Sequence, residues 1–178
     1  SLMPTGTVIA CTWNKELTRE LMEFEGSELN SHQIDTLLGP GINIQRNPLN
    51  GRNFEYFSED PLLTASLVIE ELRGLYKHGI YATIKHFAAN SQETDRRKHN
   101  SIVSERALRE IYLKAFELAV AQKEITQSIM TSYNRINGHW AASNFDLDNT
   151  ILRQEWGYTG LVMTDWWAKS NYEGHQAE

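Results

Sequence analysis

The sequence predicts an α/β fold in which parallel strands are covered by helices on the outside. Short apolar runs alternate along the chain with longer segments whose apolar residues recur at helical spacing. This alternation is typical of a parallel sheet with helices packed against it. Each of the clearest strands is followed by polar or ionisable residues; these strands begin at Gly41, Ile80, Ser128 and Leu161. In parallel α/β barrels the functional site lies at the carboxyl ends of the strands, so these residues are expected to form a site.

Size and charge narrow the class of protein. The chain has 178 residues, enough for one sizeable core, and a net charge of -6, which argues against binding to nucleic acid. No apolar run approaches the roughly 20 residues of a membrane span. The single Cys11 cannot form an internal disulfide, so nothing demands an oxidising compartment and we expect a cytoplasmic protein. The ends, SLMPTG and NYEGHQAE, resemble neither a native start nor a natural stop, so the chain is expected to begin and end within a domain.

The first third of the chain is expected to contain a β-prone run, a helix and a strand. The β-prone run is residues 7–12, TVIACT. Asn14 can cap the helix that follows, because a side-chain oxygen there accepts from free backbone N–H groups. The apolar residues expected on one side of this helix are Leu17, Leu21, Met22 and Phe24. Gly39-Pro40 signals a turn before a strand at residues 41–45.

A polar and aromatic loop, GRNFEYFSEDP, separates this strand from the next helix. Loops this rich in functional side chains are more often sites than connectors. Asp60 and Pro61 suit a cap and a first helical turn, and Lys77-His78-Gly79 suits a helix end. The expected apolar face comprises Leu63, Leu67, Ile69, Leu72 and Leu75. Residues 80–84 then predict a strand that ends at Lys85 and His86.

The second half of the chain repeats the pattern. Residues 90–100 are wholly polar and predict a loop, and Ser104 caps a helix. The core-facing stripe of that helix is expected to be Ala107, Leu108, Ile111, Tyr112, Ala115, Phe116 and Ala119. Residues 128–132 predict a strand ending at Tyr133-Asn134. Asn137-Gly138 predicts a turn, and residues 144–156 predict a helix that Gly157 ends.

The segment GLVMTDWW, residues 160–167, predicts a short buried strand that ends at Asp165. A carboxylate between an apolar run and two large aromatic residues, Trp166 and Trp167, is partly removed from water. Burying an unpaired charge is costly, which favours a chemical role or a hydrogen-bond network. The alternative is that Asp165 caps the next segment. The polar residues at the other strand ends favour the interpretation of Asp165 as a nucleophile. Trp167 is expected to be a core residue.

The converging groups suit a sugar better than other ligands. No phosphate-binding glycine loop or G-x-S-x-G elbow is present, and His86, His99 and His139 lie on separate segments, so neither a cofactor nor a metal is expected. Charged donors suit hydroxyl groups, and an indole suits the apolar face of a sugar ring. A glycosidase with Asp165 as one of two carboxylates is therefore plausible.

Each candidate also has a structural explanation. Lys85 could be solvated, His86 could be a satisfied core residue, and Arg52 could simply pair with Glu55 or Glu59. Trp166 could also belong to the core. The carboxylates that rival Asp165 are Glu93, Asp95 and Glu105, the last of which suits the first turn of a helix.

Five motifs occur in order between about Pro4 and Trp167: GRNFEYFSEDP, TIKHFAANSQET, SERALREIYLKAFELAV, IMTSYNRING and GLVMTDWW. Together they resemble glycoside hydrolase family 3, and most of all its β-glucosidase-type members. The resemblance implies a parallel (β/α)8 barrel of the TIM type. Because such a barrel needs about 250 residues, residues 1–178 are expected to be an incomplete part of that single catalytic domain.

The resemblance also implies roles for individual residues. Asp165 would be the nucleophile that forms a glycosyl-enzyme intermediate. The other implied site residues are Arg52, Lys85, His86 and Arg96, which would bind sugar hydroxyls, Tyr133 near the nucleophile, Trp166 stacked on the sugar, and Met130 on the same wall.

The implied activity is retaining, exo-acting removal of a terminal β-D-glucosyl or related residue from a β-glucoside or oligosaccharide. The acid/base glutamate would come from an α/β sandwich domain that this chain lacks, so the isolated chain is expected to be inactive. KHFAAN in place of KHFPG disfavours action on N-acetylglucosaminides. Two alternatives stay open: an inactive carbohydrate-binding remnant of the same fold, and a different barrel enzyme, such as an aldolase using Lys85.

Overall fold

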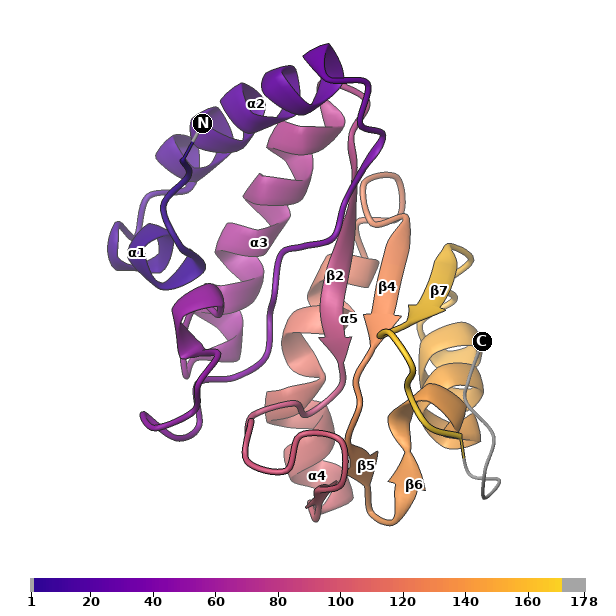
Figure 1. Cartoon of the computed structure of the whole chain (residues 1–178). Helices are drawn as coiled ribbons and strands as arrows, with labels where there is room; N and C mark the ends of the chain where they lie inside the picture. The colour runs from indigo at the N-terminus through magenta and orange to yellow at the C-terminus, as the bar shows by residue number, and fades with distance from the viewer. Residues whose placement is uncertain (1, 171–178) are drawn as a thin grey trace.

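The computed structural model describes residues 2–170 and contains a parallel sheet with the order β1-β2-β4-β7. Figure 1 shows three of its strands, β2, β4 and β7, side by side. These strands are β1 (Thr36–Leu37), β2 (Tyr81–Phe87), β4 (Ser128–Thr131) and β7 (Leu161–Thr164). Every neighbouring pair is parallel. The predicted α/β class is confirmed, and within residues 2–170 the sheet is open, as expected of an incomplete barrel. Residues 171–178, where the chain was expected to end within a domain, lie outside the described residues.

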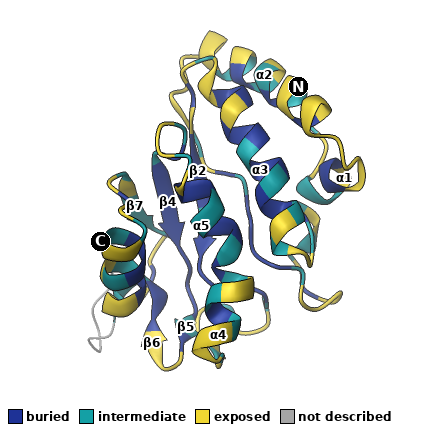
Figure 2. Cartoon of the chain, turned by 180° about the vertical axis from the view of Figure 1, so that it is seen from behind, coloured by how far each residue is buried: buried dark blue, intermediate teal, exposed yellow. Residues whose placement is uncertain are grey.

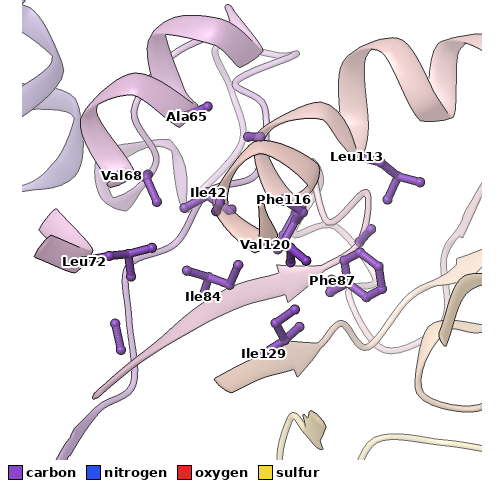
Figure 3. Close-up of a cluster of buried hydrophobic side chains, with 14 of the residues drawn as sticks. Ile42, Ala65, Val68, Leu72, Ile84, Phe87, Leu113, Phe116, Val120 and Ile129 are labelled. Atoms are coloured by element: carbon purple, nitrogen blue, oxygen red, sulfur yellow. The ribbon is translucent and has the colours of Figure 1, made fainter. Parts of the chain in front are cut away.

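Helices cover one face of this sheet. Figure 2 shows α5 (Lys114–Val120) in front of β2 and β4 when the molecule is seen from behind, with α3 (Pro61–Tyr76) beside it. The core lies between these helices and the sheet. Figure 3 shows Ile84 and Phe87 of β2 packed with Phe116 and Val120 of α5. The Phe87 and Phe116 rings meet edge to face, with centroids 5.1 Å apart.

The expected β-prone run at residues 7–12 is instead helix α1 (Gly6–Cys11). Its helical form buries Ile9 and Ala10 together while leaving Val8 exposed. The Thr7 hydroxyl also donates hydrogen bonds to the carbonyl oxygens of Asn53 and Tyr56, at 2.7 and 2.8 Å. Tertiary packing therefore overrides the β propensity of this segment.

Helix α2 (Lys15–Ser31) begins as predicted, since Asn14 Oδ1 accepts a hydrogen bond from the Leu17 N–H at 3.1 Å. Its predicted apolar face is partly wrong, because Leu17 and Phe24 are exposed. The buried positions of α2 are Thr18, Met22 and Gly26. The reason is a close crossing with α3 at Gly74, where a Cβ would lie 2.6 Å from the Arg19 carbonyl oxygen.

Helix α3 has the predicted ends. Asp60 Oδ1 accepts from the N–H groups of Leu62 and Leu63, and Gly79 follows with a φ of 75°. The strand predicted at residues 41–45 does not form. Gly41 makes one bridge to Lys85, and the Ile42 N–H donates to the Lys85 carbonyl. By Gln45 the partner has changed, since its N–H donates to the Ser58 carbonyl.

The helix after Ser104 is built in three parts: α4 (Glu105–Ala107), the π-helical turn η2 (Leu108–Tyr112) and α5. Ser104 Oγ accepts from the Ala107 N–H, which confirms the cap. The wider π turn shifts the buried face, so Leu113 is fully buried and Ile111 is 40% exposed. The prediction that Ile111 belongs to the core-facing stripe is therefore wrong.

The second half of the chain adds a small second sheet of β3 (Asn100–Ser101), β5 (Arg135–Ile136) and β6 (His139–Trp140). The predicted turn at Asn137-Gly138 joins β5 to β6, and both turn residues have positive φ. Short helical turns η1 (Asn53–Glu55) and η3 (Ala141–Ser143) and the π-helical segment η4 (Asp146–Glu155) complete the elements.

Strand β7 is more exposed than predicted. Leu161 is 63% exposed, because β4 is the neighbour of β7 in the sheet and no strand within residues 2–170 covers its outer edge. In the same range, no helix is both long and apolar enough to cross a bilayer.

Candidate active site

A bulge in β2 presents two consecutive side chains to the side of the sheet away from the helices. Lys85 is paired with Met130 and Phe87 with Thr131, so the register shifts and His86 is the extra residue. Ile84 and Phe87, on either side, both pack into the helix-covered core. The bulge thus frees both Lys85 and His86 from that core.

Asp165 follows β7 and is 6% exposed. Its Oδ1 accepts a hydrogen bond of 2.8 Å from the Trp166 N–H. Its Oδ2 lies 3.6 Å from Arg96 Nη2 and 3.8 Å from His86 Nε2. No helix follows within residues 166–170, so Asp165 is not a helix cap there. The carboxylate instead faces residues that come from the loop after β2 and from β2 itself.

His86 is buried and neutral. It is 2% exposed, and its Nδ1 lies 3.4 Å from the hydroxyl of the buried Tyr56. Burial, and then the positive charges of Arg52, Lys85 and Arg96, hold the pKa of the imidazole well below its usual value. The contact between His86 and Asp165 is therefore not an ion pair, although its length would allow one.

Glu55 joins the two remaining cationic candidates. Its Oε1 accepts a hydrogen bond from Arg52 Nε, and its Oε2 lies 3.5 Å from Lys85 Nζ. The alternative pairing of Arg52 with Glu55 is thus present. The pair does not remove Arg52 from the site, because Glu55 also holds Lys85 at the same place.

A third group surrounds Tyr133, at the end of β4. The Tyr133 hydroxyl donates a 2.5 Å hydrogen bond to the Trp166 carbonyl, which also accepts from Arg97 Nη2 at 3.0 Å. The Arg96 guanidinium lies 4.7 Å from the centroid of the Tyr133 ring. Burial and the charge of Asp165 raise the pKa of the Tyr133 hydroxyl, which keeps it a donor.

The indole rings at the end of β7 face outward. Trp166 is half-exposed beside Asp165. The prediction that Trp167 is a core residue is wrong, because its side chain is 65% exposed and its φ is 57°. The left-handed backbone at Trp167 turns the ring away from the apolar interior, toward Arg97.

The structure therefore brings the predicted residues to one end of the sheet in linked groups. Asp165 contacts His86 and Arg96, and Arg52 and Lys85 meet at Glu55. Met130 is paired in register with both Lys85 and Met163. Of the rival carboxylates, Glu93 lies 3.3 Å from Arg96 and Glu105 pairs with Arg109 on the outer surface. Within residues 2–170, no cluster of three or more His, Cys, Asp or Glu could hold a metal.

Sequence reasoning missed the residues that support the site: Tyr56, Arg97, the bridging role of Glu55, and Asn43. Tyr56 and Glu55 lie within the loop GRNFEYFSEDP, whose composition marked it as functional, but composition does not say which side chain reaches which neighbour. Asn43 carried no such signal, because it lies in an apolar run predicted to be a strand.

Chemically, the site offers a buried carboxylate with cationic and neutral donors around it and an exposed indole beside it. This set can hold a polyhydroxylated ligand and present the carboxylate to one of its carbons.

Nearly the whole of this chain matches known proteins in sequence and in fold. Residues 1–178 match the family model described as "Glycosyl hydrolase family 3 N terminal domain". The chain is 56% identical to a beta-glucosidase of Ruminococcus albus, over 97% of this chain and 18% of that protein. It is 46% identical to an exo-alpha-(1->6)-L-arabinopyranosidase of Bifidobacterium longum, over 93% of this chain and 22% of that protein.

Solved structures give the same result. A beta-glucosidase from Paenibacillus barengoltzii superposes with a TM-score of 0.94 at 60% identity, covering 100% of this chain and 19% of that one. Beta-glucosidase 3B from Thermotoga neapolitana in complex with glucose superposes with a TM-score of 0.91 at 47% identity, covering 94% of this chain and 23% of that one. The chain thus spans about one fifth of the length of the relatives that it matches.

Proposed function

Since the chain belongs to glycosyl hydrolase family 3, as part of its N-terminal domain, we propose that the complete protein is a retaining, exo-acting glycosidase. It would remove a terminal β-D-glucosyl or related residue from a β-glucoside or oligosaccharide. The observation that carries the proposal is the Asp165 carboxylate, buried at the end of β7 with Oδ2 facing Arg96 and His86. The beta-glucosidases among its relatives support the substrate class.

In this mechanism, Asp165 attacks the anomeric carbon as the bond to the leaving group breaks, which forms a glycosyl-aspartate ester. Oδ1 accepts the Trp166 N–H, which orients the carboxylate, and Oδ2 is the oxygen on the side of Arg96 and His86. Water then attacks the same carbon and releases Asp165. The acid/base glutamate protonates the departing oxygen in the first step and takes a proton from the attacking water in the second. Two inversions at one carbon give overall retention.

The surrounding residues would bind the sugar. Arg52, Lys85 and Arg96 supply charged donors, and Glu55 between the first two supplies an acceptor, so adjacent hydroxyls of one ring can be satisfied together. The half-exposed Trp166 offers an apolar face to the C–H groups of the ring. Tyr133 and Met130 complete the wall near the nucleophile.

We further propose that this chain is one part of a single (β/α)8 catalytic barrel and that a separate α/β sandwich domain supplies the acid/base glutamate. The chain's coverage of about one fifth of its relatives supports the need for further parts. A cytoplasmic location stays a prediction, to be tested by fractionation of the native cells.

The test is Asp165→Ala in the complete enzyme. Because the carboxylate would form the intermediate, we expect kcat for an aryl β-glucoside to fall by about 10³-fold or more while the thermal midpoint is retained. Asp95→Asn is the matched control, since it neutralises an exposed carboxylate of the loop after β2, at a left-handed position that Asn accepts. It should keep near-normal turnover.

Two outcomes would contradict the proposal. Near-normal hydrolysis by the Asp165→Ala enzyme would show that Asp165 is not the nucleophile. A complete, folded wild-type protein that hydrolyses neither aryl β-glucosides nor aryl α-L-arabinopyranosides would favour the inactive carbohydrate-binding remnant. The second substrate is included because of the arabinopyranosidase among the relatives.

A further inference from the structure

The backbone of His86 is held by a side chain where strand pairing stops. Up to Lys85, β2 pairs with the preceding segment through its backbone, since Lys85 N–H donates to the Pro40 carbonyl and Ile42 N–H donates to the Lys85 carbonyl. At His86, the side chain of Asn43 replaces the backbone as the hydrogen-bond partner. The His86 N–H donates to Asn43 Oδ1, and Asn43 Nδ2 donates to the His86 carbonyl, both at 2.9 Å.

This clamp is buried and specific. Asn43 is 1% exposed and His86 is 2% exposed, so water does not compete for these hydrogen bonds. An amide matches both backbone groups of one residue, because it has an acceptor and a donor side by side. A carboxylate could accept from the N–H but could not donate to the carbonyl, and an alanine would leave both backbone groups unpaired.

The clamp acts at the bulged residue of β2. A bulge gives the extra residue freedom that a regular ladder would remove, and here His86 is the residue without a backbone partner in β4. The ring of His86 is contacted on its two nitrogens by Tyr56, at 3.4 Å, and by Asp165, at 3.8 Å. A shift of the His86 backbone would therefore move the imidazole relative to the carboxylate.

We infer that Asn43 is a positioning residue for the hydrolytic reaction, and that it acts by fixing the backbone of His86 and hence the imidazole beside Asp165. The inference rests on the proposed function. Asn43 itself does not touch the substrate in this account. Its effect on turnover passes through His86.

The experiment compares Asn43→Ala with Thr126→Val in the complete enzyme. Thr126 is also buried, and its hydroxyl donates a 2.6 Å hydrogen bond to the Ala119 carbonyl at the other end of β4. Each variant thus removes a buried bond from a side chain to the backbone. We expect kcat/KM for an aryl β-glucoside to fall about 10²-fold for Asn43→Ala and to stay within about twofold for Thr126→Val.

A double-mutant cycle with His86→Ala separates positioning from general stability. If Asn43 acts through His86, Asn43→Ala should lower kcat/KM by less than about threefold in the His86→Ala background. Equal losses in both backgrounds would overturn the inference. Should Asn43→Ala fail to fold, Asn43→Asp serves in its place, because it keeps the acceptor for the His86 N–H and loses the donor.

Failure of the inference and failure of the proposed function are distinguishable. The cycle is run only on a wild-type enzyme that hydrolyses the glucoside and loses turnover with Asp165→Ala. Within that enzyme, normal kcat/KM for Asn43→Ala counts against the positioning role alone.

Discussion

Adjacent residues of strands β2 and β4 face opposite sides of the sheet, and the two sides differ in the contacts that stabilise them. Toward the helices, Ile84, Phe87 and Ile129 pack with α3 and α5 (Figure 3). On the other side, Lys85 and His86 carry ionisable groups next to the fully buried Met130. The helix side is stabilised by apolar area, whereas the other side depends on polar contacts such as those of Glu55 with Lys85 and of Asn43 with His86.

This difference follows from the physics of the two kinds of contact. Burial of apolar surface is non-directional, so many packings of similar volume satisfy it. A buried polar group must meet a partner with the right geometry, or its desolvation is uncompensated. Substitutions on the helix side should therefore change stability, and substitutions on the other side should change turnover.

Phe116→Ala tests the helix side with the largest expected change. The ring is fully buried against Phe87, and its loss leaves a cavity. We expect the free energy of unfolding of the complete protein to fall by about 3–5 kcal/mol, measured by denaturant titration, while kcat of the folded enzyme is retained.

Phe145→Ala is the matched control, because the Phe145 side chain is largely exposed. Its loss should change stability by less than about 0.5 kcal/mol. An equally small change in the free energy of unfolding for Phe116→Ala would contradict the proposed difference between the two sides.

Glu71→Gln tests a buried ionisable group of α3, on the helix side. Burial, and then the charge of Glu25, raise the pKa of the Glu71 carboxyl from 4.5 to about 8. The folded state therefore holds a proton that the unfolded state releases above about pH 4.5. Stability conferred by the protonated form is complete below that pH and is lost as the pH rises toward 8. The Gln variant should gain in thermal midpoint over wild type progressively from pH 5 to pH 8, and turnover should not change.

Glu70→Gln is the control for this prediction. Glu70 is equally buried but pairs with Arg73 at 2.6 Å and lies 3.7 Å from Arg19. Its neutralisation should destabilise the protein, since it removes the negative charge beside both arginines. A Glu71→Gln difference that stays constant from pH 5 to pH 8 would show that Glu71 carries no raised pKa in the complete protein.

Much of the helix side could be predicted from the sequence. The caps Asn14, Asp60 and Ser104 and the strands β2 and β4 follow from local chemistry and periodicity. The errors lie where tertiary contacts decide the outcome. Residues 7–12 form a helix because Ile9 and Ala10 bury together, and β7 is exposed because it lies at an edge within the described residues.

The sequence predicted that the candidate residues gather at the strand ends, but it did not predict the contacts among them. Polar residues at the strand ends indicated where it lies, and the family resemblance supplied the proposed roles. The contacts of Glu55, Tyr56 and Asn43 depend on the β2 bulge and on a loop that folds back over the sheet, neither of which has a periodic signal. Such partners are set by three-dimensional geometry, so a single sequence does not reveal them.

The most direct test of the central claim is to trap the intermediate in the complete enzyme with a 2-fluorinated aryl β-glucoside and to map the adduct by peptide mass spectrometry. We predict a covalent sugar on the peptide that contains Asp165, at its side-chain carboxylate. A sugar attached instead to Glu55, Glu93 or Asp95 would contradict it.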